Sequence, residues 1–136
     1  MNHGPARYND LAMRTATVTT IKKSRILSDA TDRTGRYGVA KLAELLEWPV
    51  SDIAKYLGRA QSPVSQSRVR QEKLAALAAL VQDVFALTQS NVRVMRAWFR
   101  TPLGTLDGIT PREEILRGNL WRVRNLVDEM HSGLAF

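Results

Sequence analysis

The chain has 136 residues, of which 44% are hydrophobic and none is cysteine. This length suits one domain, or two very small ones that share a core. Without cysteine, disulfides and thiolate metal sites are excluded, which fits a reducing cytoplasm, and no apolar run approaches the roughly 20 residues that span a bilayer. We therefore expect a cytoplasmic protein without a membrane partner.

The net charge of +7 favours an acidic partner, with nucleic acid as the first candidate. Residues 1–73 hold thirteen Lys/Arg and seven Asp/Glu, whereas residues 74–136 hold seven and six. The first half is therefore the expected site of contact with an acidic partner. The second half is expected to have another task.

Residues 1–34 are polar, rich in Thr and Arg, and show no sustained hydrophobic period. We interpret them as a mobile N-terminal arm. A start-site extension without a role and an arm that contacts DNA explain this segment equally well.

From residue 35 onward the hydrophobic spacing is helical, and no strand pattern competes with it, so the predicted fold is all-α. The first helix ends at Pro49 and carries on one face Val39, Leu42, Leu45 and Leu46. The second begins with Ser51 as its N-cap, ends at Gly58, and turns inward Ile53, Ala54 and Leu57.

A third helix starts with Ser62 as N-cap and Pro63 at its first position, and it either runs on or breaks once before residue 74. A helical period follows at Leu74, Leu77, Leu80, Val81, Val84 and Phe85. We assign residues 74–97 to a connecting helix whose apolar surface serves dimerisation.

The next helix is capped by Ser90 or Asn91, and it buries Val92, Met95, Trp98 and Phe99. The stretch RTPLGTLDGITPREEI, residues 100–115, then interrupts the helical pattern and is predicted to be a connector. Thr110 and Pro111 begin a further helix in a Thr-x-x-Glu capping box, and Gly118 and Asn119 separate it from the last helix. That helix ends at Gly133 and buries Leu120, Val123, Leu126, Val127 and Met130.

A helix-turn-helix needs a small residue where its second and third helices cross, a Gly at the turn, and an apolar residue on the inner face of the third helix. Ala54, Gly58 and Val64 have the required separations of four and six residues. The sequence thus predicts a helix-turn-helix DNA-binding region over residues 35–73, with a recognition helix at residues 62–70. A plain helical hairpin with a solvated basic face is the alternative.

The outward side chains of this region are suited to DNA contacts. Gln and Arg make bidentate contacts with adenine and guanine edges, while Ser, Lys and further Arg side chains hold phosphates. The candidate DNA-binding residues are Arg59, Gln61, Ser62, Ser65, Gln66, Arg68, Arg70 and Lys73. A homodimer is expected, because one helix-turn-helix rarely contacts enough DNA alone.

No residue pattern indicates catalysis. His3 and His131 have no partner at metal-ligand spacing, and motifs for a nucleophile or a phosphate-binding loop are missing. Glu113 and Glu114 are neighbours, so on a helix they diverge by about 100° and do not face each other as an acid–base pair. We interpret them as charges at a helix N-terminus, and we expect no catalytic residue, no metal, no cofactor and no enzymatic activity.

The run from Trp98 to residue 136 resembles the C-terminal toxin-binding domain of the Xre/MbcA/ParS antitoxin family. The matching positions are Trp98, Pro102, Leu106, Gly108, Thr110-Pro111, Ile115-Leu116, Val123, Leu126 and Gly133. This family carries a helix-turn-helix on the N-terminal side of that domain, so the resemblance covers roughly residues 38–136. The long arm and Gly118 depart from the family pattern.

The resemblance implies a type II toxin–antitoxin system with residues 98–136 as a small helical toxin-binding domain. The partner would be a RES-domain toxin that consumes NAD as a glycohydrolase, a phosphorylase or an ADP-ribosyltransferase. In the family, the C-terminal end of the antitoxin enters the toxin's active-site cleft and blocks access to NAD. Mapped onto this chain, the toxin-binding residues are Met130, His131, Ser132, Gly133, Leu134, Ala135 and Phe136. Without the resemblance, a tail that folds back on the core would be preferred.

The leading hypothesis is therefore an antitoxin that inhibits a cognate RES-domain toxin and represses its own operon by binding operator DNA, as a homodimer within a hetero-oligomer. The runner-up is a stand-alone helix-turn-helix transcriptional regulator whose C-terminal half only dimerises. A third interpretation is a protein-binding adaptor with a vestigial helix-turn-helix.

Overall fold

The computed structural model describes Thr31, residues 36–58 and residues 63–133, with the backbone alone at residues 63–66. The fold is all-α, as predicted, and the described residues form no strand. The elements are α2 (Val39–Leu46), α3 (Val50–Leu57), α4 (Pro63–Leu87), α5 (Val92–Phe99), the 3-10 helix η1 (Gly104–Leu106), α6 (Pro111–Leu116) and α7 (Leu120–Ser132). None of the described helices is long and apolar enough to cross a bilayer. The predicted arm, residues 1–34, lies outside the described residues except for Thr31.

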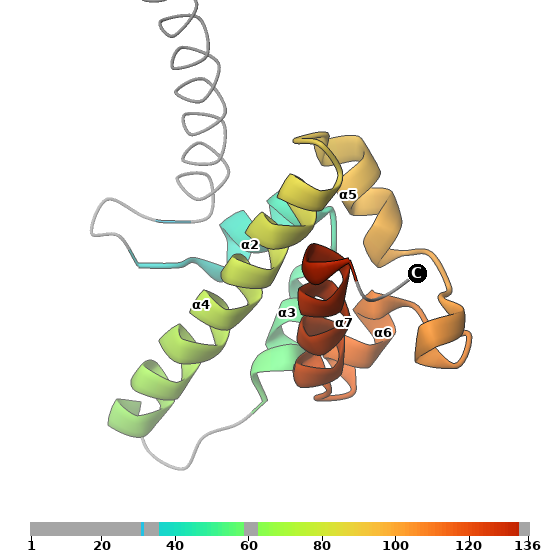
Figure 1. Cartoon of the computed structure of the whole chain (residues 1–136). Helices are drawn as coiled ribbons and strands as arrows, with labels where there is room; N and C mark the ends of the chain where they lie inside the picture. The colour runs from blue at the N-terminus through green and yellow to red at the C-terminus, as the bar shows by residue number, and fades with distance from the viewer. Residues whose placement is uncertain (1–30, 32–35, 59–62, 134–136) are drawn as a thin grey trace, which may run out of the picture.

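Helix α4 runs unbroken over 25 residues, so the break that the sequence left open does not occur. Its predicted apolar face is buried at Leu74, Leu77, Leu80, Val81, Val84 and Phe85. Helices α3, α5 and α7 pack against it, and Figure 1 shows α7 beside its second half. The prediction that this apolar face mediates dimerisation is wrong for these residues, because helices of the same chain cover them.

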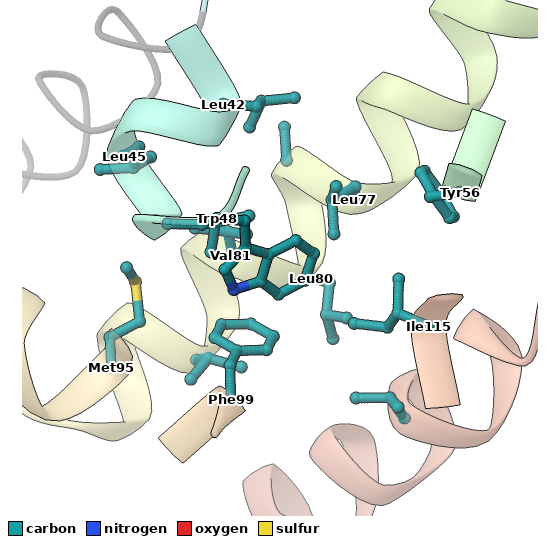
Figure 2. Packing of buried hydrophobic residues seen from close by; sticks show 14 of the residues in the cluster. Leu42, Leu45, Trp48, Tyr56, Leu77, Leu80, Val81, Met95, Phe99 and Ile115 are labelled. Atoms are coloured by element: carbon teal, nitrogen blue, oxygen red, sulfur yellow. The ribbon is translucent and has the colours of Figure 1, made fainter. Parts of the chain in front are cut away.

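Aromatic side chains at the centre of the core join the two halves of the chain. The ring of Phe99 is fully buried and meets Trp48 edge-on at 5.8 Å and Trp98 edge-on at 5.3 Å between ring centroids. Figure 2 shows Phe99 close to the Trp48 indole, surrounded by side chains of several helices. One cluster of buried hydrophobic residues extends from Leu42 in α2 to Val127 in α7. The regions predicted to bind DNA and toxin therefore share a core.

Polar contacts cross between the same two halves. Arg112 at the start of α6 donates hydrogen bonds to the carboxylate of Asp52 in α3, and its guanidinium lies 5.9 Å from the centre of the Trp48 ring. Arg96 in α5 donates from Nε to the carbonyl oxygen of Leu45 in α2 at 2.7 Å. These side chains fix α2 and α3 against α5 and α6 at the surface of the shared core.

The N-terminal end of α3 differs from the prediction, and its C-terminal end agrees with it. The N-cap is Pro49, whose φ of −58° leads into the helix, and its carbonyl oxygen accepts the N–H of Asp52 at 2.9 Å. The predicted cap, Ser51, therefore lies inside the first turn and is exposed. Gly58 ends the helix as predicted, with a φ of 67° and its N–H donated to the carbonyl oxygen of Ala54.

The inward face of α3 differs from the predicted one. Ile53 is buried and Leu57 is half-buried, as expected, but Ala54 is exposed and Tyr56 is buried. Ile53, Tyr56 and Leu57 form an i, i+3, i+4 stripe, from which Ala54 is turned away by about 100°. The predicted place of Ala54 at a helix crossing is therefore wrong, and the helix-turn-helix itself stays a prediction.

The helix ends predicted for the second half are confirmed. The Oδ1 atom of Asn91 accepts two N–H groups of the first turn of α5, at 3.1 and 3.2 Å. Thr110 Oγ1 accepts the N–H of Glu113 at 3.1 Å, with Pro111 as the first residue of α6. Gly133, with a φ of 78°, ends α7. The predicted inward side chains are buried or half-buried at Val92, Met95, Trp98, Phe99, Leu120, Val123, Leu126, Val127 and Met130.

Candidate functional site

The first turns of α4 extend beyond the other helices in Figure 1. Four consecutive side chains here, at residues 67–70, are all exposed. Because neighbouring residues on a helix are turned by about 100°, four of them cover its whole circumference, so no other described helix packs on this part of α4. We call residues 67–70 the projecting segment.

The projecting segment carries two of the predicted DNA-binding residues, Arg68 and Arg70. Arg68 Nε lies 3.4 Å from Glu72 Oε1, and both side chains are largely exposed. An exposed pair of this kind is weak, so a phosphate can take the place of the carboxylate. Ser65 and Gln66 belong to α4 by their backbone, and the predicted contacts at Arg59, Gln61 and Ser62 lie outside the described residues.

Lys73, the last predicted DNA contact, has a different environment. Its Nζ atom donates to the carbonyl oxygens of Leu57 at 3.2 Å and Tyr56 at 3.4 Å, which are free acceptors at the C-terminal end of α3. In return, the Tyr56 hydroxyl donates to the Lys73 carbonyl oxygen at 2.7 Å. Burial raises the pKa of Tyr56 to about 12, so this hydroxyl keeps its proton. Lys73 therefore holds α3 to α4, and we withdraw it from the DNA-contact set.

A second side chain of α4, two residues before Lys73, also holds a distant segment, and the sequence did not indicate it. We call its paired hydrogen bonds to Tyr37 the Gln71–Tyr37 clamp. The Gln71 side chain accepts the Tyr37 N–H at 3.1 Å with Oε1 and donates to the Tyr37 carbonyl oxygen at 3.0 Å with Nε2. Tyr37 also forms an isolated antiparallel bridge with Thr31, whose carbonyl oxygen accepts from Lys41 Nζ at 2.9 Å. The chain that precedes α2 is thus fastened to α4 next to the projecting segment. A Gln inside a polar run gives no sequence signal for such a contact.

The stretch at residues 100–110 is a closed connector, as predicted. Leu103 and Ile109 form an antiparallel bridge, and the Gly108 N–H donates to the Leu103 carbonyl oxygen at 2.9 Å. Asp107 and Gly108 have φ values of 58° and 79°, a conformation that Gly and Asp tolerate better than most residues. The Leu106 side chain is buried and ties the connector to the core.

Glu114 lies in the first turn of α6, as predicted, but it is buried, with only 1% of it exposed. Its Oε1 atom accepts from Asn119 Nδ2 at 3.0 Å, and Oε2 accepts from the guanidinium of Arg122. Arg122 also donates to Asp107 Oδ2 in the connector at 2.8 Å. The hydrogen bonds from Asn119 and Arg122 hold the pKa of Glu114 below its ordinary value, although burial opposes them. This network joins the connector, α6 and α7.

We expect Glu114→Gln to destabilise the fold by about 2 kcal/mol at neutral pH, because a hydrogen-bonded charge pair is lost inside the protein. Since folding lowers the pKa of Glu114, its contribution is complete above its ordinary pKa of about 4.5 and declines as the pH falls through the lower folded-state value. Urea unfolding of both proteins between pH 7 and pH 3 checks this. A difference in unfolding free energy that stays constant over that range would contradict it.

The predicted toxin-binding end begins on α7. Met130 is half-buried and packs against the core, whereas His131, Ser132 and Gly133 are exposed. Leu134, Ala135 and Phe136 lie outside the described residues. Gly133 donates its N–H to the Met130 carbonyl oxygen at 3.2 Å and so closes the helix just before this tail.

Helix α7 also carries an exposed aromatic side chain that the sequence reasoning did not single out. Trp121 is 63% exposed, and Asn125, Asp128 and Ser132 continue its exposed face at helical spacing toward Gly133. A large exposed Trp is typical of protein interfaces, where such side chains contribute a large share of the binding energy. The sequence could have indicated this residue, because Trp121 falls on the polar face of an amphipathic helix.

The described residues thus present two exposed surfaces, the projecting segment of α4 and the outer face of α7. No group of three or more His, Asp or Glu side chains that could hold a metal ion occurs in the described part of the chain. The cationic projecting segment suits a polyanion, and the exposed face of α7 suits a protein. Comparison of the chain with protein-family models, with curated proteins and with solved structures found no match.

Proposed function

We propose that this chain is the antitoxin of a type II toxin–antitoxin system and that it inhibits a RES-domain toxin that consumes NAD. The observation that carries the proposal is the resemblance of residues 98–136 to the toxin-binding domain of Xre/MbcA/ParS antitoxins. The matching residues have physical roles in this chain, which supports the resemblance: Leu106, Ile115 and Val123 are buried, and Gly108 and Gly133 have positive φ.

In the proposed mechanism, residues 131–136 enter the toxin's active-site cleft and deny NAD access to it, while Met130 stays packed against the core. Helix α7 is suited to present this end, because its inner face is anchored in the core and Gly133 directs the chain out of the helix. The exposed Trp121 face would contact the toxin outside the cleft. The cleft of an NAD-consuming enzyme binds an aromatic, phosphate-bearing molecule, and Phe136 supplies an aromatic ring for the same space.

Co-expression tests the inhibitory function. The reading frames that flank the one for this chain are first searched for a RES domain, as the proposal requires. The RES-domain protein is then expressed from an inducible promoter, and cellular NAD and growth are measured with and without the chain. We expect the toxin alone to deplete NAD and the chain to restore it, with both proteins purifying as one complex. A chain that neither restores NAD nor co-purifies would favour the stand-alone regulator instead.

We further propose that the chain represses its own operon by binding operator DNA through residues 59–70. The excess of positive charge in residues 1–73 and the exposed cations of the projecting segment support this. DNA affinity that arises from phosphate contacts falls with salt, and each lost contact lowers the slope by about one.

We expect Arg68→Gln/Arg70→Gln to weaken binding to the DNA upstream of the chain's own reading frame and to lower the salt slope by about two. Arg93→Gln/Arg100→Gln is the matched control, because these exposed arginines carry the same charge and lie in the second half. Fluorescence anisotropy at several salt concentrations gives both quantities. Equal slopes for the two variants would leave the projecting segment without a role in DNA binding.

A further inference from the structure

We infer that Gln71 and Lys73 are positioning residues for DNA binding, which fix the direction of the projecting segment by holding its base on two flanks. The inference rests on the proposed DNA-binding function and deepens it. It concerns the part of α4 where packing ends: Leu74 is fully buried, residues 67–70 are exposed, and Gln71 and Lys73 between them are half-buried. From there, the helix extends beyond the other helices toward its N-terminal end (Figure 1).

The two side chains leave α4 on opposite flanks of its buried face. Because neighbouring residues on a helix are turned by about 100°, Leu74 and Leu77 lie about 60° and about 120° around the axis from Gln71. In the same direction, Lys73 lies about 160° from Gln71. The buried stripe therefore runs between the two polar side chains. A helix that packs through one face can tilt sideways on that face, and contacts on both flanks oppose this tilt.

Each flank is bonded to the backbone of a residue that is itself anchored in the core. On one flank, the Gln71–Tyr37 clamp joins the Gln71 amide to the N–H and the carbonyl oxygen of Tyr37, whose side chain packs against the core. On the other flank, Lys73 Nζ donates to the carbonyl oxygens of Leu57 and Tyr56 at the end of α3, and the Tyr56 side chain is buried. The Tyr56 hydroxyl completes this second set by donating to the Lys73 carbonyl oxygen. We call it the Lys73–Tyr56 clamp.

The projecting segment amplifies any movement at its base. Arg68 lies five residues beyond Lys73, or about 7.5 Å along the axis, so a tilt of about 10° at the base moves its backbone by about 1 Å. Hydrogen bonds to phosphate oxygens form over a range of only about 0.5 Å, and binding residues have to be held within about that tolerance. A tilting segment therefore loses phosphate contacts for part of the time. The affinity for DNA falls although no contact residue has changed.

The first test measures the affinity of the full chain for a fluorescent duplex of the DNA upstream of its own reading frame, over a range of salt concentrations. The variants are Gln71→Ala, Lys73→Met and the two combined. Gln82→Ala is the control for Gln71, because Gln82 is a half-buried glutamine on the same helix. Arg124→Gln is the control for Lys73, because it removes one positive charge and the contact of α7 with Asp83 in the second half of α4. Circular dichroism melting gives a temperature at which every variant is folded.

We expect each clamp variant to weaken binding several-fold and the combined variant to weaken it further, whereas neither control changes the affinity. The salt slope should stay at the wild-type value in all of them, because no phosphate contact is removed. Arg70→Gln, which removes a proposed contact, should lower the slope by about one. Lys73→Arg keeps a cationic donor for the two carbonyl oxygens and should bind like wild type.

The second test follows the projecting segment in the absence of DNA. The chain contains no cysteine, so spin labels attach only at introduced ones. Val69→Cys in the projecting segment and Val94→Cys on α5 use two exposed positions, and pulsed electron paramagnetic resonance gives the distribution of distances between the two labels. We expect a narrow distribution in the otherwise wild-type chain and a broader one when Gln71→Ala and Lys73→Met are added. The two control substitutions should leave it narrow.

Three outcomes would overturn the inference in different ways. Clamp variants that bind like their controls, or whose label distribution stays narrow, show that the clamps do not fix the direction of the segment. A Lys73→Met variant that lowers the salt slope by about one shows that Lys73 is itself a phosphate contact. A wild-type chain that does not bind the duplex contradicts the DNA-binding part of the proposed function, and the inference falls with it.

Discussion

A chain that stops at Gly133 is expected to fold like the full chain and to lose the proposed protection against a RES-domain toxin. Gly133 already closes α7 through its positive φ and its hydrogen bond to Met130, so removal of residues 134–136 leaves the helix complete. The described core ends on α7. If the tail occupies the toxin's NAD cleft, its removal reopens the cleft while the rest of the complex remains possible.

Cellular NAD in the presence of the toxin measures this prediction, and the thermal midpoint of the purified chain reports on its fold. We expect NAD to fall to the level seen with toxin alone, with an unchanged thermal midpoint and unchanged DNA affinity. Phe136→Ala in the full chain separates the aromatic ring from the rest of the tail and should give partial protection.

The opposite result is equally informative. A truncated chain that still protects fully would show that the tail is not the inhibitory element. Trp121→Ala then becomes the decisive variant, because the exposed face of α7 is the remaining candidate surface. Loss of protection in that variant alone would move the inhibitory contact from the tail to the helix.

Phe99→Ala is expected to cost about 4 kcal/mol of folding free energy, the largest loss that we expect from one substitution. The ring is completely buried and touches the edges of Trp48 and Trp98, so its removal leaves a cavity between the two halves of the chain. A domain of this size has about 5–15 kcal/mol of stability in total. About 1–11 kcal/mol would remain, so any loss of folded protein should be largest at the low end of that range and should reduce the proposed DNA binding and toxin inhibition together.

Urea unfolding measures the loss, and Val94→Ala in the same helix is its control. Val94 is 48% exposed, and its truncation should change stability by no more than about 0.5 kcal/mol. A Phe99→Ala variant that unfolds like the control would contradict the aromatic centre of the core. Loss of one function with the other retained would contradict the shared core.

Features that depend on nearby residues were predictable from the sequence. The caps at Asn91 and Thr110 and the stop at Gly133 follow from side-chain and backbone chemistry within a few positions. The buried stripe of α4 follows from its 3.6-residue period. Nothing distant in the chain has to be known for these features, which is why the all-α fold and most helix boundaries were predicted correctly.

Features that depend on distant residues were not predictable. The burial of Tyr56 and the exposure of Ala54 depend on how α3 is rotated against its neighbours, and a period of 3.6 over eight residues leaves that rotation open. In the sequence, Lys73 is one cation among several. Its hydrogen bonds to two carbonyl oxygens of α3 depend on how α3 packs against α4. Glu114 was predicted as a charge at a helix N-terminus, but its burial was not predictable, because its partner Arg122 lies eight residues away, on another helix.

Because α4 is unbroken, this protein cannot be divided into independent fragments in the way that a two-domain protein can. Proteins whose two tasks lie on either side of a linker can be cut into fragments that each keep one task. Here the first turns of α4 carry the proposed DNA contacts. The same helix continues, without a loop, into the part against which α5 and α7 pack. A fragment that ends within α4 would leave α5 and α7 without the helix against which they pack. The two tasks should therefore be separable by point substitution but not by proteolysis or by expressing halves of the gene.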